Sequence, residues 1–271
     1  MGDHVIVVDE DRETGQRLKY YSKNADVDYW TTLWASKKWT YDRQLKGYLP
    51  RYLRDTFLKW VRPGARVLEA GCGIAHFTVA AHALGYRAEG LDWSEQTIHR
   101  LKARFPGISW HVGDVRKLEF DDGVFDAVYS PGVCEHFEEG PTQILAETRR
   151  ILSPSGIAVI VTPCYNRWLQ ARAHRLFAGS VPVGHFYQYA FSSDGITGLL
   201  RRIGFEVLQV RHFGTLETLM EFGNWRLPRR LQRPLHVMDY LPVFQQWGRC
   251  CVWVARRPAL ATPTRTARTA P

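Results

Sequence analysis

The sequence predicts an α/β protein in which seven strands form one mostly parallel sheet with helices on both faces. Short apolar runs alternate with segments of helical apolar spacing between residues 66 and 203, the pattern of parallel strands joined by helices. The first apolar run ends in a glycine-containing turn from which a helix starts at once. The chain has 271 residues, of which 45% are hydrophobic and 23% charged, enough for one sizeable core.

The individual elements follow from apolar spacing and from start and stop signals. A helix is expected after Pro50, because Leu53, Phe57 and Val61 recur at helical spacing before the stop signal Pro63-Gly64. Strands are then expected over residues 66–70, 87–91, 108–112, 125–130 and 157–161, with helices over 77–84, 98–105 and 144–152 between them. A helix over 196–203 and strands over 205–210 and 250–255 bring the number of strands to seven.

The chain divides into three expected parts. Residues 1–62 form an aromatic-rich N-terminal cap and helix, residues 63–257 the main domain with an insertion at about 215–247, and residues 258–271 a disordered tail with few apolar groups. The cap holds Tyr20, Tyr21, Tyr29, Trp30, Trp34, Trp39, Tyr41, Tyr48, Tyr52, Phe57 and Trp60. These rings either close over a ligand or tie an N-terminal extension to the sheet.

Cysteine usage and the absence of targeting signals indicate a cytoplasmic protein. The five cysteines include no Cys-x-x-Cys pair, which is typical of reduced thiols rather than of a disulfide framework or zinc site. The N-terminus MGDHVIVVDE lacks a basic start and a long apolar region, so we expect neither export nor lipidation. No apolar run approaches the ~20 residues that cross a bilayer.

Positive charge is concentrated in the C-terminal part. The net charge is +9; residues 1–166 carry 21 basic and 22 acidic side chains, whereas residues 167–271 carry 15 arginines and 5 acidic side chains. In the insertion, Arg229, Arg230 and Arg233 are interleaved with apolar residues between Trp225 and Val237. These arginines either contact an anionic substrate or membrane surface, or form a solvated face.

Acidic residues follow three successive strands at their carboxyl ends. Glu69 precedes the glycine turn and suits a ligand with a cationic amine. Asp92 lies 92 − 71 = 21 residues beyond the first glycine, where a ribose diol would lie, and Asp114 is placed to accept a hydrogen bond from an adenine amine. The fingerprint for dinucleotide binding requires glycine where His76 stands, so that class is disfavoured.

Four motifs together resemble the class I S-adenosylmethionine-dependent methyltransferases, in their branch of small-molecule enzymes. They are LEAGCG at 68–73, GLDWS at 90–94, GDV at 113–115 and FDAVYSPGVCEHF at 125–137. The resemblance covers residues 60–210 and implies a Rossmann-like seven-stranded sheet with an antiparallel last strand. It also implies S-adenosylmethionine as cofactor, held at Glu69, Gly71, Cys72, Gly73, Asp92, Trp93, Asp114, Val115 and Ser130. Ala75 replaces the frequent third glycine of the family, a change that we expect to have little consequence.

The loop after the fourth strand carries the main catalytic candidate. His136 is a candidate general base for the acceptor proton, the alternative being that it only fixes the loop. His185 and Tyr187 are second-rank candidates, since that segment lines the acceptor pocket in many relatives. Magnesium-dependent relatives have glutamate where Gly132 stands, so no metal site is expected.

The predicted activity is methyl transfer to a small molecule, with oxygen favoured over nitrogen or carbon. The aromatic cap and arginine-rich insertion favour a bulky, partly apolar acceptor such as a lipid-linked intermediate, glycan or secondary metabolite. Two alternatives stay open: an RNA methyltransferase, and a non-catalytic S-adenosylmethionine-binding module. Cys164 stands where RNA cytosine-C5 methyltransferases have a nucleophile, but no RNA-binding module is recognisable, so nucleic acid is not the expected partner.

Overall fold

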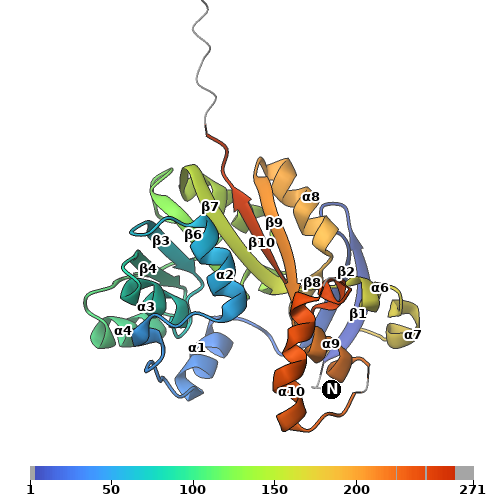
Figure 1. Ribbon diagram of the computed structural model, residues 1–271. Coiled ribbons are helices and arrows are strands. Elements are labelled where there is room, and N and C mark those ends of the chain that lie inside the picture. The colour runs from blue at the N-terminus through green and yellow to red at the C-terminus, as the bar shows by residue number, and fades with distance from the viewer. Residues whose placement is uncertain (1–3, 224, 242, 260–271) are drawn as a thin grey trace, which may run out of the picture.

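The centre of the molecule is a seven-stranded sheet in a computed structural model that describes residues 4–223, 225–241 and 243–259 (Figure 1). Its strands are β3 (Arg66–Ala70), β4 (Arg87–Asp92), β5 (Ser109–Val112), β6 (Phe125–Pro131), β7 (Leu152–Pro163), β9 (Glu206–Phe213) and β10 (Cys250–Arg256). They lie in the order β5-β4-β3-β6-β7-β10-β9, and β10 runs antiparallel to both of its neighbours. The predicted sheet with its antiparallel last strand is confirmed.

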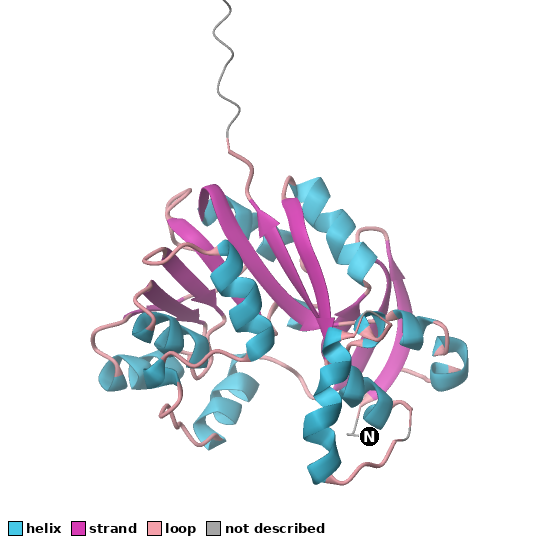
Figure 2. Ribbon diagram, viewed as in Figure 1, coloured by secondary structure: helices cyan, strands magenta, loops and turns pink. Residues whose placement is uncertain are grey.

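Helices cover both faces of this sheet (Figure 2). They are α2 (Arg51–Trp60), α3 (His76–Ala83), α4 (Glu95–Arg104), α5 (Thr142–Ile151) and α8 (Ser193–Ile203). Along β7, Ile157, Val159 and Val161 pack in a cluster with α2 and α3, whereas Ala158 and Ile160 pack in a cluster with α5 and α8. Because both faces of β7 are buried, the strand reads as a continuous apolar run.

A second, three-stranded sheet corrects the expectation of seven strands in all. It consists of β1 (Val5–Asp11), β2 (Gly15–Ser22) and β8 (His185–Phe191), paired antiparallel in the order β1-β2-β8. A bridge between Cys164 and Phe191 joins β8 to the end of β7. This sheet is not evident from the sequence, because β2 and β8 lie far apart along the chain and each shows only a short local pattern.

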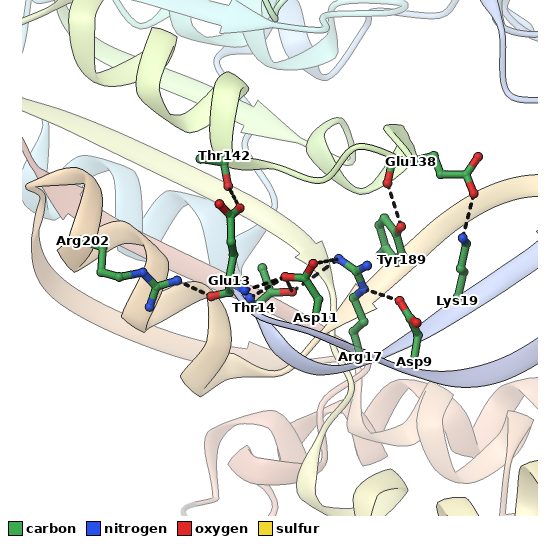
Figure 3. Close-up of polar contacts among 10 residues, drawn as sticks. All are labelled: Asp9, Asp11, Glu13, Thr14, Arg17, Lys19, Glu138, Thr142, Tyr189 and Arg202. Atoms are coloured by element: carbon green, nitrogen blue, oxygen red, sulfur yellow. Dashed lines mark hydrogen bonds and ion pairs between the residues drawn. The ribbon is translucent and has the colours of Figure 1, made fainter.

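Polar contacts fasten the β1–β2 hairpin to the main domain (Figure 3). The Glu13 carboxylate accepts a hydrogen bond from Thr142 at the start of α5, and its carbonyl accepts one from Arg202 in α8. Arg17 is buried, with its Nε 2.7 Å from Asp9 Oδ2. The hairpin is therefore held against α5 and α8.

Short helices gather at the end of the molecule toward which the parallel strands run (Figure 1). They include α1 (Val27–Ser36), η1 (Gln44–Lys46) and η2 (Cys134–His136), then α6 (Arg167–Gln170) and α7 (Ala173–Phe177). The segment between β9 and β10 contains α9 (Thr215–Glu221), α10 (Arg229–Leu235), η3 (His236–Tyr240) and η4 (Gln245–Trp247). Among the described residues, no helix is both long and apolar enough to cross a membrane. Of the expected tail, residues 260–271 lie outside the described residues.

Candidate functional site

Two adjoining cavities lie at the carboxyl ends of β3, β4 and β6. The first has a volume of about 60 Å³ and is lined by Trp30, Trp34, Gly71, Asp92, Trp93, Gly113, Val115, Gly132, Val133, His136 and Phe137. The second has a volume of about 480 Å³ and contacts Glu69, Cys72 and the rings of Tyr48, Tyr52, Phe77 and Tyr129. Trp30, Trp34, Gly71, Gly132 and His136 line both cavities, so these residues surround the junction.

The turn after β3 brings backbone close to this junction, and only glycine fits there. Gly71 has a φ of +78°, and a Cβ on it would lie 2.4 Å from Val133 Cγ2. Gly73 has a φ of +49°, and a Cβ on it would lie 2.8 Å from the Trp34 ring. Ala75 also has a positive φ, +56°, which costs a non-glycine residue roughly 1–2 kcal/mol.

Asp92 ties the glycine turn to the end of β4. Its side chain is buried, Oδ2 accepts from the Gly73 N–H at 2.8 Å, and Oδ1 accepts from the Ser94 N–H at 3.0 Å. Burial raises the pKa of this carboxyl above its usual value. Asp92 therefore both shapes the turn and offers an acceptor to the first cavity.

Glu69 places a second buried carboxyl at the other cavity. Its Oε2 accepts from the Thr78 N–H at 2.9 Å and from the Thr78 hydroxyl at 2.5 Å. Burial raises the pKa of Glu69 to about 8. The group is therefore mostly protonated at neutral pH, and a cation beside it would favour the charged form.

The third acidic residue differs from the expectation. Both oxygens of Asp114 accept from the Arg116 guanidinium, at 2.7 to 3.1 Å, and Asp114 does not line either cavity. The neighbouring Gly113 and Val115 line the first cavity instead, as does Trp93. The carboxylate is turned toward its own loop because arginine stands two residues later.

Of two other predicted cofactor residues, Cys72 lines a cavity and Ser130 does not. Cys72 is buried, lines the second cavity and packs in a cluster with Trp39, Tyr41 and Trp110. Ser130 is also buried but lines neither cavity, whereas its strand neighbours Tyr129 and Pro131 line the second.

His136 lies at the junction with one nitrogen fixed. Nδ1 is 2.8 Å from the carbonyl oxygen of Tyr187. Because a carbonyl only accepts, Nδ1 carries the hydrogen and Nε2 keeps its lone pair in the neutral ring. Burial lowers the pKa of His136 to about 4, so the ring is neutral at physiological pH. Its Nε2 can therefore accept a proton.

Of the two second-rank catalytic candidates, Tyr187 contacts His136 and His185 lies away from the site. His185 is exposed at the start of β8 and lines neither cavity, so the structure does not bring it to the site. Tyr187 contributes its carbonyl to His136, while its half-buried ring packs edge-on against that imidazole at 5.3 Å between centroids. Cys164 is buried and lines neither cavity; hydrogen bonding with Cys251 and His212 lowers the pKa of its thiol.

Three residues at or near the two cavities were not among the expected site residues: Trp30, Trp34 and Glu135. Trp30 and Trp34 of α1 stack 5.6 Å apart, 26° from parallel, and line both cavities. Glu135 is 2% exposed, and its Oε2 has no hydrogen-bond partner. The aromatic density of residues 20–60 signalled the tryptophans, but no pattern in the sequence shows that Glu135 turns inward. In the described part of the chain, no three His, Cys, Asp or Glu residues are grouped to hold a metal.

Comparisons with known proteins agree on one family. A family model described as a methyltransferase domain matches residues 41–210. A "probable S-adenosylmethionine-dependent methyltransferase" of Mycolicibacterium smegmatis is 30% identical over 53% of this chain and 53% of its own. A sterol 24-C-methyltransferase of Gibberella zeae is 29% identical over 70% of this chain and 52% of its own. The chain thus spans about half the length of these curated relatives.

Solved structures share the fold at low identity. An S-adenosylmethionine-dependent methyltransferase from Mesorhizobium loti has a TM-score of 0.55 and 22% identity, covering 79% of this chain and 100% of its own. The [4+2]-cyclase SpnF has a TM-score of 0.54 and 20% identity, covering 77% of this chain and 81% of its own. Likeness at this level concerns the fold, which hosts more than one chemistry.

Proposed function

Because the chain belongs to the class I S-adenosylmethionine-dependent methyltransferases, we propose that it methylates an oxygen of a small-molecule acceptor in the cytoplasm. The observation that carries this proposal is the position of His136, whose proton-accepting Nε2 belongs to a ring at the junction of two cavities. The five cysteines are all free, which suits a reducing compartment.

The residues of the two cavities fit the cofactor. Asp92 would accept from the ribose hydroxyls, Trp93 and Val115 would contact the adenine, and Glu69 with Gly71 would face the ammonium group. S-adenosylmethionine supplies a methyl group bonded to a positively charged sulfur, which an acceptor oxygen can attack directly. The remaining tasks of the protein are to orient the acceptor and to remove its proton.

His136 is suited to the proton transfer. The Tyr187 carbonyl holds the hydrogen on Nδ1, which leaves Nε2 free to take the proton of an acceptor hydroxyl. Since the pKa of about 4 keeps the ring neutral, protonation does not remove the base anywhere between pH 5 and 8. A base with a pKa of about 4 is too weak to form a free alkoxide, so the proton passes to Nε2 as the oxygen attacks the methyl group, when the forming bond makes the hydroxyl more acidic.

The larger cavity supports a bulky, partly apolar acceptor. Its volume of about 480 Å³ lies within the range of small-molecule sites, and aromatic and aliphatic side chains dominate its wall. Such a wall suits a lipid-linked intermediate, a glycan attached to an apolar group, or a secondary metabolite. The relatives named for sterol and malonyl-[acyl-carrier protein] methylation share only 29% and 31% identity with this chain, too little to transfer their acceptors to it.

The segment between β9 and β10 is proposed to approach an anionic acceptor or membrane surface. Five of its described large apolar side chains are exposed: Trp225 at 46%, Leu231 at 46%, Val237 at 55%, Leu241 at 43% and Val243 at 67%. Exposed apolar groups next to arginines in the sequence favour such contact. Binding to anionic vesicles that weakens from low to high salt is the expected result, and equal binding to neutral vesicles would contradict it.

The experiment has two stages. First, the protein is incubated with methyl-labelled S-adenosylmethionine and fractionated cell extract, and label is expected in organic-soluble or small polar material. Label in RNA would favour the RNA alternative, and cofactor binding without turnover would favour a non-catalytic module.

In the second stage, His136→Ala is compared with His99→Ala, which removes an exposed imidazole from α4. We expect His136→Ala to lower kcat by roughly 10² to 10⁴ with cofactor affinity within about twofold of wild type. His99→Ala should behave as wild type. An unchanged rate in His136→Ala would exclude the imidazole as the base.

A further inference from the structure

We infer that the β1–β2 hairpin and β8 together are a positioning device for His136: they hold the loop carrying it at two points and thereby set its tautomer. The inference rests on the proposed role of His136 as a base. The residues concerned line neither cavity, so they would act through the imidazole and not on the acceptor.

The first point is a bulge in β8. Tyr20 of β2 pairs with Gln188, and Tyr21 pairs with Phe186, so Tyr187 is left without a register partner between them. A bulge of this kind releases a residue from the ladder and redirects its groups, and bulges occur often beside active sites. Here the Tyr187 carbonyl is the group that accepts the His136 Nδ1–H at 2.8 Å.

Neighbouring rings hold Tyr187 in this position. His4, which precedes β1, stacks on its ring with centroids 5.0 Å apart and planes 25° from parallel. Tyr29 of α1 meets the same ring edge-on at 6.2 Å. The bulged residue is thus held from both the hairpin and the helix that covers the junction.

The second point lies two residues after His136, at Glu138 (Figure 3). The Tyr189 hydroxyl donates to the Glu138 carbonyl at 2.8 Å, and Lys19 Nζ is 2.7 Å from Glu138 Oε1. Lys19 and Tyr189 are themselves register partners across β2 and β8. One cross-strand pair therefore holds both the backbone and the side chain of Glu138.

Burial and a contact with Arg17 fix the ring of Tyr189. Its ring is 1% exposed, and the Arg17 guanidinium lies 3.9 Å from the ring centroid. Tyr187 and Tyr189 are two residues apart on one strand, so the two points are fixed relative to each other. If the loop moved, Nδ1 would lose its acceptor and the hydrogen could transfer to Nε2, which could then no longer take a proton.

The test compares variants of the hairpin and of β8 in the full chain. Tyr189→Phe and Lys19→Met remove the contacts to Glu138, and Lys19→Arg keeps an ion pair there. Glu13→Gln alters the contact of the hairpin with Thr142 at the start of α5, outside residues 136–138, and is the matched control. The readouts are kcat, KM, cofactor affinity, unfolding midpoint, and ¹⁵N spectra of histidine-labelled protein, in which the His136→Ala spectrum identifies the His136 signals.

We expect the Tyr189→Phe, Lys19→Met double variant to lose about tenfold or more in kcat, with KM and cofactor affinity within twofold. Its His136 spectrum should shift from Nδ1-protonated toward a mixture of tautomers, while Lys19→Arg and Glu13→Gln resemble wild type. An unchanged tautomer, or an equal loss of kcat in Glu13→Gln, would overturn the inference. If His136→Ala keeps full activity while the tautomer still shifts in the double variant, the proposed base is wrong and the positioning stands.

Discussion

Replacing Glu135 by glutamine should reduce the loss of stability at alkaline pH. Burial raises the pKa of this carboxyl from 4.5 to about 8, and its Oε2 accepts no hydrogen bond. The folded protein therefore holds the proton more tightly than the unfolded chain, and this contribution is complete below pH 4.5 and lost as the pH rises through about 8. At about 1.4 kcal/mol for each tenfold difference in proton affinity, the loss is about 2 kcal/mol at pH 6 and about 5 kcal/mol above pH 8.

Urea unfolding of wild type and Glu135→Gln between pH 5 and pH 9 measures this effect. The unfolding free energy of the variant minus that of wild type should rise by about 3 kcal/mol between pH 6 and pH 9. Burying an amide without hydrogen-bond partners destabilises the variant equally at every pH. The change with pH in the difference between the two unfolding free energies is therefore the test, and the size of that difference at any one pH is not. Glu119→Gln, at an exposed carboxylate, is the control and should follow wild type. A difference between Glu135→Gln and wild type that stays constant with pH would refute the reasoning.

Three further predictions concern the cofactor. Asp92→Ala should weaken cofactor binding in calorimetry by about 10-fold or more, because a charged acceptor worth roughly 1.5–3 kcal/mol and the anchor of the Gly73 N–H are both lost; affinity within twofold of wild type would argue against the assignment. Tryptophan fluorescence should change on cofactor binding, and replacing Trp30, Trp34 and Trp93 together by phenylalanine should remove most of that change; a signal that persists in this variant would place the cofactor elsewhere. Cofactor binding at pH 7 should release a proton, measured in buffers of different ionisation enthalpy, and Glu69→Gln should abolish the release.

The main sheet was predictable because its strands are specified locally. Four of the five parallel strands, β3, β4, β6 and β7, are mostly buried and precede a helix, so neighbouring residues suffice to identify them. The second sheet has no such local signature, since β2 finds its partner β8 only through tertiary contact. The same limit applies to His185 and Tyr187 of β8, whose places relative to the two cavities depend on the pairing of β8 with β2.

The position of the candidate site could be predicted from the sequence, but the directions of its side chains could not. Strand ends brought Glu69 and Asp92 to adjoining cavities, as expected from parallel topology. The carboxylate of Asp114 turned instead to Arg116, a local ion pair that strand position cannot reveal. The tautomer of His136 depends on a backbone carbonyl 51 residues along the chain, and no residue type encodes such a partner.

The pairing of β2 with β8 also sets an order of events during synthesis. Lys19 and Tyr189 are 189 − 19 = 170 residues apart, a separation that translation at about 5–20 residues per second needs on the order of ten seconds to cover. Because a two-stranded hairpin alone is marginally stable in water, β1 and β2 form a stable sheet only after β8 has been synthesised. The nascent chain can therefore assemble the parallel strands β3 to β7 while His136 still lacks the Tyr187 carbonyl, and the hydrogen bond that fixes its tautomer forms only after β8 is made.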